Sequence, residues 1–241
     1  MAVWSVTLIG FAVGTVGTGA GGLYVLFMKD VRMRRMNAIL GFSGGIMLVA
    51  VFLELLPEAV MISGLIYTLI GIILGVMFLT ASEDLIEFTR FCCASEKNFC
   101  KAGSLLFLAI ASHNFPEGMA IGSGYVASSG VGFLLATAIA VHNIPEGLAV
   151  AAAFKMSGMS SAKAFLWAAL AGIPMGFGTL LGQAVGGVSP ILITVSLGFA
   201  AGAMLYTTCA EILPEVFIAQ DAVPGGFLWG IITGALLFKI L

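Results

Sequence analysis

Charged residues are scarce in this sequence. Asp, Glu, Lys and Arg together make up 9% of the 241 residues, whereas soluble domains carry about 25%. Hydrophobic residues reach 60%, above the roughly 45–50% of soluble domains. A globule of this size cannot bury so much apolar surface, so the composition excludes an ordinary soluble domain and predicts that lipid surrounds most of the chain. The net charge of −2 is too small to suggest a nucleic-acid partner.

Cysteine is also rare, and its placement excludes the disulfide framework of a small secreted protein. Three of the four cysteines, Cys92, Cys93 and Cys100, lie in one short polar stretch. The basic residues assign this stretch to the cytoplasm, where thiols stay reduced. The spacing of the three cysteines differs from that of a zinc finger, so they give only a weak indication of metal binding.

Long apolar runs fill most of the chain. A membrane-spanning helix needs roughly 20 apolar residues, and runs of this length exceed a membrane strand. The sequence therefore predicts an all-α, polytopic membrane protein with one transmembrane domain over 1–241. The eight predicted spans are about 3–28, 38–60, 64–88, 102–126, 130–154, 162–187, 190–218 and 224–241.

The basic residues predict how these spans are oriented. Nine of the ten Lys and Arg residues fall between spans 1 and 2, 3 and 4, or 5 and 6, which all lie on one side. The tenth, Lys239, lies near the C-terminus on the other side. Because basic loops stay in the cytoplasm, we expect a multi-pass protein of the cell membrane with both termini on the extracytoplasmic side.

Two internal repeats indicate an inverted architecture. Residues 41–60 and 198–217 agree at nine of twenty positions with an offset of 157, and the hexapeptides 113–118 and 142–147 both read His-Asn-x-Pro-Glu-Gly with an offset of 29. The first repeat relates spans 2 and 7, and the second relates spans 4 and 5. Because the span numbers in each pair differ by an odd number, the two spans of each pair cross the membrane in opposite directions. The pattern predicts a 3+2+3 inverted-repeat bundle. Such repeats recur in transporters, whose substrate sites lie near the membrane midplane.

The paired hexapeptides carry side chains suited to binding a metal ion. On a helix, His113 and Glu117 share a face, and Asn114 and Glu117 share a neighbouring face. Imidazole and carboxylate ligands suit zinc, iron, manganese and similar ions. One such motif would fit ordinary packing equally well, but two mirrored motifs that hold the only two histidines favour a binding site. The span 5 candidates are His142, Asn143 and Glu146.

The prolines and glutamates of the motifs support the same interpretation. Pro116 and Pro145 remove a helical hydrogen bond within their spans, and irregular backbone at membrane depth is tolerated where it lines a cavity. An ionised carboxylate at the centre of a span costs at least ~2.5–3.5 kcal/mol. A bound cation would offset this cost for Glu117 and Glu146.

The sequence resembles the ZIP family of zinc- and iron-regulated metal transporters, in its prokaryotic form. The two HNxPEG motifs and the GF-x-x-G-x-M pattern of span 2 carry the resemblance. It implies uptake of zinc, or of iron, manganese, cobalt or cadmium, toward the cytoplasm through a site between spans 4 and 5, with no enzymatic activity and no cofactor beyond the transported ion. The resemblance implies a first metal position at His113, Glu117, His142 and Glu146 near Met47, and a second at Asn114 and Asn143 with both glutamates.

Two departures from the family pattern concern the second metal position. Relatives often carry a Glu-Pro pair in span 6, where this chain has Met175-Gly176. Asn143 also stands where some relatives have aspartate. Both changes remove negative charge, so we expect the first position to be complete and the second to be weakened.

Several alternatives remain open at this stage. Glu54, Glu58, Glu211 and Glu215 lie toward the ends of spans 2 and 7, where they fit steps along an ion path and interfacial charges about equally. An intramembrane metallohydrolase would need an activated water and an open coordination position, and no HExxH motif is present. A passive channel is a further alternative. A homodimer in the lipid bilayer is one open oligomeric state.

Overall fold

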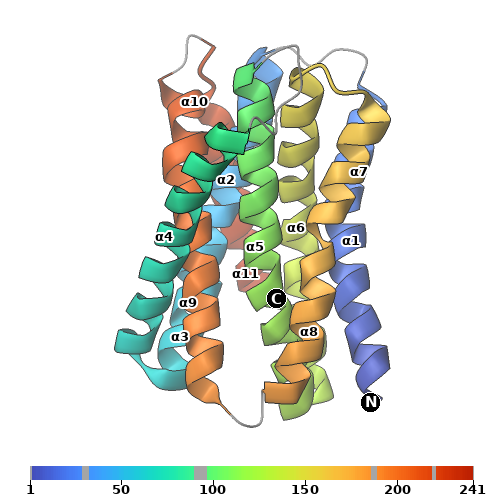
Figure 1. Ribbon diagram of the computed structural model, residues 1–241. Helices are drawn as coiled ribbons and strands as arrows, with labels where there is room; N and C mark the ends of the chain where they lie inside the picture. Colours follow the sequence, from blue (N-terminus) through green and yellow to red (C-terminus); the bar gives the residue numbers. More distant parts are fainter. Residues whose placement is uncertain (1, 29–32, 90–96, 186–188, 219–220, 241) are drawn as a thin grey trace.

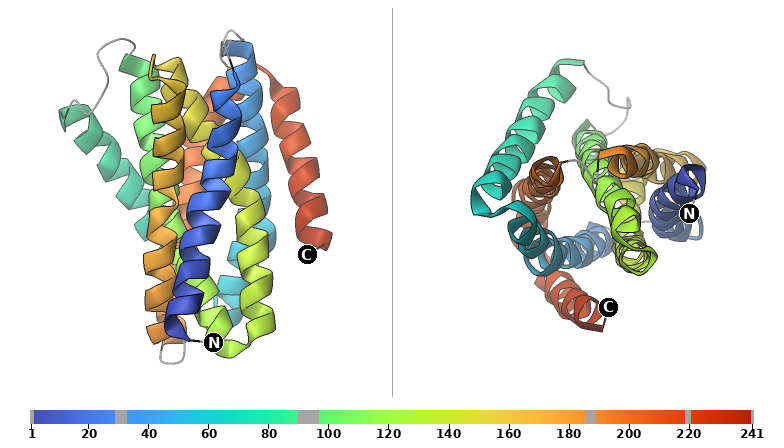
Figure 2. Two further views of the ribbon diagram at one scale, coloured as in Figure 1. Left: turned by 90° about the vertical axis from the view of Figure 1, so that its right-hand side faces the viewer. Right: turned by 90° about the horizontal axis from the view of Figure 1, so that it is seen from below.

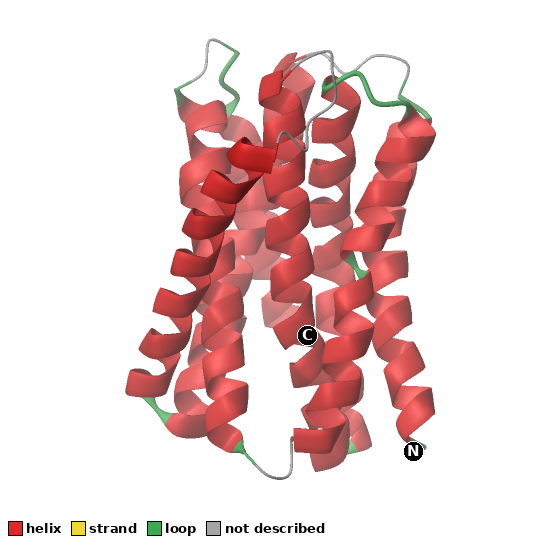
Figure 3. Ribbon diagram, in the orientation of Figure 1, coloured by secondary structure: helices red, strands yellow, loops and turns green. Residues whose placement is uncertain are grey.

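The computed structural model describes residues 2–28, 33–89, 97–185, 189–218 and 221–240. These residues form eight helical stretches joined by short connections, with no strand among them (Figures 1 and 3). The stretches are α1 (Val3–Leu26), the run of α2 (Met33–Ala50), η1 (Val51–Leu55) and α3 (Leu56–Ser63), α4 (Leu65–Thr89), α5 (Lys97–Ala127), α6 (Ser129–Met156), the pair α7 (Ser161–Ala171) and α8 (Ile173–Val185), the run of α9 (Pro190–Tyr206), η2 (Thr207–Ile212) and α10 (Leu213–Phe217), and α11 (Pro224–Ile240).

Each predicted span corresponds to one helical stretch. The largest differences are at the starts of α2 and α5, which begin at residues 33 and 97 rather than 38 and 102. Hydropathy misses these turns because polar and basic residues precede the apolar runs. The all-α prediction is confirmed, while the division of the chain into a single domain stays a prediction.

The surface of the bundle is apolar enough for lipid. Five of the helical stretches are long and apolar enough to cross a membrane, and α4 and α11 contain shorter apolar segments, among the residues the structure describes. Large apolar side chains are exposed along the outer face of α4, including Ile66, Ile70 and Ile73. A soluble protein would not expose such a continuous apolar face, so the prediction of a polytopic membrane protein is confirmed.

Close backbone approaches divide the helices into two groups. In the first group, a Cβ atom added to Gly21 of α1 would lie only 1.9 Å from the carbonyl oxygen of Ile144 in α6, which shows how closely the two backbones approach. In the second, a Cβ at Gly71 of α4 would lie 2.3 Å from the carbonyl oxygen of Val195 in α9. The first group contains α1, α5, α6, α7 and α8, and the second contains α2, α3, α4, α9, α10 and α11. Viewed from below, α1 and α4 lie on opposite sides of the bundle (Figure 2, right).

Helix packing follows the relation that the repeats predict. The repeats predict that span 1 is equivalent to span 6, span 2 to span 7, span 3 to span 8 and span 4 to span 5. This exchange converts the extensive interface between α1 (span 1) and α6 (span 5) into the interface between α8 (span 6) and α5 (span 4). The same exchange converts the interface between α4 (span 3) and α9 (span 7) into the interface between α11 (span 8) and α2 (span 2). Both of these interfaces are also extensive. The packing therefore supports the inverted arrangement that residues 41–60 and 198–217 indicate.

Two π-turns occupy equivalent places in this repeat. In η1 the N–H of Leu56 bonds to the carbonyl oxygen of Val51, and in η2 the N–H of Leu213 bonds to that of Thr208, each five residues back. Each π-turn precedes a proline, Pro57 or Pro214, whose missing N–H leaves the helical ladder one bond short. The sequence repeat thus corresponds to a repeated irregularity of the backbone.

Lys155 anchors the C-terminal end of α1. Its ammonium donates to the carbonyl oxygen of Val25 at 3.2 Å, to that of Met28, and to the hydroxyl of Ser161 at 2.9 Å. The carbonyls after the last turn of a helix have no partners within it, and a cation there also suits the negative end of the helix dipole. This basic residue of the predicted cytoplasmic side therefore joins α1, α6 and α7.

Candidate metal-binding site

The two hexapeptides face each other across the α5–α6 interface. The Nε2 atom of His113 on α5 lies 3.2 Å from Oε2 of Glu146 on α6. The Nε2 atom of His142 on α6 lies 3.3 Å from Oε1 of Glu117 on α5. Each histidine therefore contacts the glutamate of the other motif, as expected for two helices related by a two-fold axis.

These side chains are buried, and several of their polar atoms have no partner. His113, Glu117 and Glu146 are 0% exposed. Among the described residues, no hydrogen-bond partner is found for Nδ1 of His113, Oε2 of Glu117 or Oε1 of Glu146. Leaving a buried polar atom unsatisfied costs about 1–3 kcal/mol, and more when the group is charged. A site with several such atoms is suited to a cation that would bind them.

The two asparagines are oriented so that their oxygens are left available. Asn114 donates its amide N–H to the carbonyl oxygen of Ala171 at 3.0 Å, and Asn143 donates to that of Val13 at 3.3 Å. The Oδ1 atoms of both asparagines are buried and have no hydrogen-bond partner within the described part of the chain. Because the amide nitrogens are held by backbone carbonyls of neighbouring helices, the oxygens remain as potential ligands for a cation.

The site is built as two pairs rather than as one compact cluster. Within the described residues, no three His, Cys, Asp or Glu side chains converge closely enough to hold one metal ion. The two His–Glu contacts nevertheless use atoms that are metal ligands in other proteins. A metal ion that binds such a nitrogen and oxygen would replace the contact between them, so binding an ion requires these pairs to open.

The other predicted site residues have mixed placements. Met47 is buried in α2, which packs against α6, and its sulfur lies 3.9 Å from the hydroxyl of Ser43. Within the part of the chain that the structure describes, no hydrogen bond joins Met47 to the paired motifs. Sequence reasoning missed a contact of Met175, whose sulfur lies 3.9 Å from the amide nitrogen of Asn143. Cys92 and Cys93, and the side chains of Cys100, Glu211 and Glu215, lie outside the described residues.

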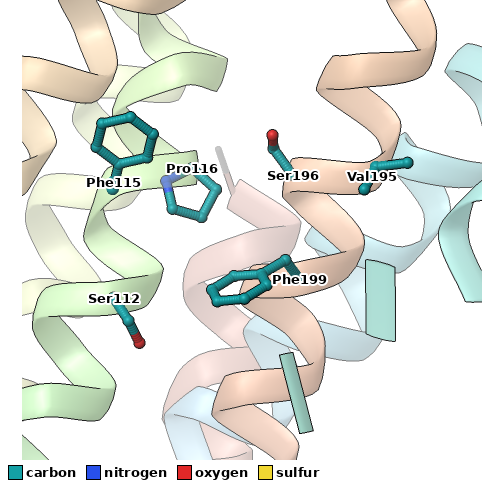
Figure 4. A pocket seen from close by; sticks show the side chains of 6 residues that line it. All are labelled: Ser112, Phe115, Pro116, Val195, Ser196 and Phe199. Carbon is teal, nitrogen blue, oxygen red and sulfur yellow. The ribbon is translucent and has the colours of Figure 1, made fainter. Parts of the chain in front are cut away.

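A cavity of about 340 Å³ lies beside Pro116, between the two helix groups. Figure 4 shows its lining from α5 and α9: Ser112, Phe115, Pro116, Val195, Ser196 and Phe199. The lining is mostly apolar and contains none of the paired His and Glu residues. A cavity therefore lies next to one of the motif prolines, but none of the candidate metal ligands lines it.

A bundle of membrane-spanning helices that buries His, Asn and Glu side chains is typical of membrane proteins that move ions. The family profile described as "ZIP Zinc transporter" matches residues 93–240, which is more than half of the chain. The chain belongs to this family.

Individual relatives extend the similarity to nearly the whole chain. The "Zinc transporter ZupT" of Corynebacterium aurimucosum is 33% identical over 218 residues, covering 83% of this chain and 82% of that protein. The "Zinc transporter ZupT" of Chlorobium phaeovibrioides is 32% identical over 251 aligned residues, covering 94% of each. The "Zinc transporter ZTP29" of Arabidopsis thaliana is 30% identical, covering 85% of this chain and 82% of that protein.

Family membership settles the broad predictions from the sequence. The resemblance to the ZIP family is confirmed, and so are the transporter class and the absence of an enzymatic role. The ligand set, the direction of transport and the side on which the termini lie stay predictions.

Proposed function

We propose that this chain moves divalent metal ions, zinc foremost, across the cell membrane toward the cytoplasm. In this proposal the ions pass through the site between α5 and α6, and both termini are extracytoplasmic. Iron, manganese, cobalt and cadmium are further candidate substrates. The observation that carries the proposal is the set of buried, unpartnered polar atoms on Glu117, Glu146, Asn114 and Asn143. The names of the relatives, all zinc transporters, support zinc.

The ligands proposed for the transported ion divide into two positions. The first uses His113, Glu117, His142 and Glu146, with the sulfur of Met47 as a further ligand once the His–Glu pairs have opened. The second uses the oxygens of Asn114 and Asn143 with the two glutamates. The donor set of imidazole, carboxylate and amide oxygen suits zinc and similar first-row ions.

The purified protein in liposomes is expected to take up Zn²⁺ with a rate that saturates as the zinc concentration rises. Saturation follows because each ion must occupy the central ligands before it crosses. A zinc-sensitive dye inside the vesicles measures the rate, and vesicles without protein provide the background. A rate that rises linearly without limit would indicate a passive channel, and metal-dependent hydrolysis of lipid or peptide without zinc uptake would indicate a metallohydrolase.

Met175→Glu is expected to raise bound zinc from one ion per chain to two. The sulfur of Met175 lies beside Asn143, so a glutamate there would supply a carboxylate that the second position lacks. Elemental analysis of the purified protein after removal of free zinc measures the ratio. Met175→Leu, which keeps an apolar side chain of similar size, should stay at one. A ratio of two in the unaltered protein would contradict this account of the second position.

A further inference from the structure

The cavity beside Pro116 has a lining whose hydroxyl groups are already bonded within the protein. The hydroxyl of Ser112 donates to the carbonyl oxygen of Ala109 in its own helix at 2.8 Å. The hydroxyl of Ser196 donates to the sulfur of Met119 at 3.5 Å. The other lining side chains are all apolar: Phe115, Pro116, Val195 and Phe199. The cavity is therefore better suited to an apolar ligand than to water or an ion.

The size of the cavity also indicates a ligand. Its volume is about 340 Å³, roughly twice that of an apolar cavity of ~150 Å³ that stays dry and binds benzene. Protein interiors contain few voids larger than a water molecule, and side chains that face an empty space lose dispersion contacts. Phe199 points from α9 toward Pro116 of α5 (Figure 4), so an occupant would contact both helix groups.

The cavity reaches the lipid-facing surface of the bundle. Five of its six lining side chains are half-buried, and only Pro116 is buried. On α9, Ile191 and Leu192 precede Val195 and Ser196 by four residues, so they share a face of the helix with them. Both Ile191 and Leu192 are exposed. This face of α9 therefore gives a hydrocarbon chain a continuous path from the start of the helix to the cavity.

The depth of the cavity in the membrane restricts the occupant to the tail of a lipid. Pro116 lies roughly 16 Å from the end of α5 at Ala127, and Phe199 lies roughly 14 Å from the start of α9 at Pro190, at ~1.5 Å per residue. Both helix termini lie at the same end of the bundle (Figure 1). The hydrocarbon core of a bilayer is about 30 Å thick, so the cavity lies near its middle, which the polar headgroups do not reach.

We propose that this cavity is a binding site for one acyl chain of a membrane phospholipid. The headgroup of this lipid lies at the end of the bundle where α5 ends and α9 begins. Its chain follows Ile191 and Leu192 along α9 and ends against Pro116, next to Glu117 in the chain. The site requires only that the bundle is embedded in a bilayer, so the inference goes beyond the proposed transport function and does not depend on which metal is carried.

A phosphatidylcholine with a diazirine near the methyl end of one acyl chain tests the site. The protein is reconstituted with this lipid, extracted into detergent, freed of excess lipid and illuminated, and mass spectrometry then locates the labelled residues. We expect label on the cavity walls, at Phe115 or Phe199, to be retained at least about tenfold better than label on α4, because an enclosed site covers most of the surface of its ligand. The comparison residues on α4 are Ile66 and Ile70, whose exposed apolar side chains form an open face.

Two substitutions at Ser112 separate filling of the cavity from other effects. Ser112→Leu extends an apolar side chain into the cavity and is expected to lower the retained wall label at least about fivefold, because two groups cannot share close-packed space. Ser112→Ala removes the hydroxyl without filling the cavity and is expected to keep the label. Val195→Phe fills the cavity from the α9 side and decides the question if Ser112→Leu does not fold.

Loss of the wall label in parallel with the α4 label would overturn the inference, because the labelled lipid would then be ordinary bilayer lipid. Equal wall label in the folded Ser112→Leu and Ser112→Ala proteins would also overturn it, since the volume of the cavity would then have no effect on binding. Neither result depends on zinc uptake, so the proposed transport function is tested separately.

Discussion

Glu117→Ala and Glu146→Ala are each expected to abolish zinc uptake in proteoliposomes while the protein still folds. Each carboxylate contacts the histidine of the opposite helix, at 3.3 Å and 3.2 Å, and each is assigned to both proposed metal positions. Removing one therefore removes a ligand from both. We expect a loss of at least about 100-fold in rate, because even the loss of a residue that only supports a metal ligand typically costs about 10–100-fold in metal affinity or activity.

Folding is expected to survive these changes because each removes a buried carboxylate that already has one oxygen without a partner among the described residues, at the cost of a single contact to a histidine. Size-exclusion chromatography and circular dichroism check the fold, and dye-loaded vesicles measure uptake. Ser123→Ala on α5, the helix of Glu117, is the matched control, since among the described residues the Ser123 hydroxyl bonds only to carbonyls of its own helix, at Met119 and Ala120. Unchanged zinc uptake in both alanine variants would place the transport site elsewhere.

The sequence predicts the helices well because their signal is local. Apolar runs and the loops that interrupt them set where each span begins and ends, and the structure differs most at the polar starts of α2 and α5. The repeat of residues 41–60 in 198–217 also predicts which helix pairs should have equivalent interfaces. Hydropathy and repeats, however, say nothing of side-chain pairing across an interface.

The site was only partly predictable for the same reason. Spacing places His113 and Glu117 on one face of α5, but the structure pairs each of them with the opposite helix. The contact of Met175 with Asn143 depends on how α8 packs, which no local pattern reports. Pro57 does give a signal for the π-turn before it, yet a missing N–H can be accommodated by a kink or by a π-turn, so the choice between the two emerges only from the fold.

Backbone approach sets the position of the second motif, and Gly147 is where this constraint is tightest. A Cβ added to Gly147 would lie 1.8 Å from the carbonyl oxygen of Thr18 and 2.5 Å from its Cα. Both are backbone atoms of α1, so no side-chain rotation can relieve the clash. The two helices must move apart, and the hydrogen bond from Asn143 to Val13 across the same interface would be lost with them.

Gly147→Ala is therefore expected to destabilise the protein by about 3 kcal/mol or more, at the upper end of the cost of overpacking. For a chain of this length that corresponds to a fall of about 10 °C in melting temperature. Gly130→Ala in the same helix is the control, because its added Cβ would meet only the Ser128 hydroxyl, at 3.9 Å. Thermal unfolding in detergent measures both variants. Equal melting temperatures of the two variants would show that α1 and α6 can separate without cost. The contact between these two backbones would then not explain the position of His142, Asn143 and Glu146.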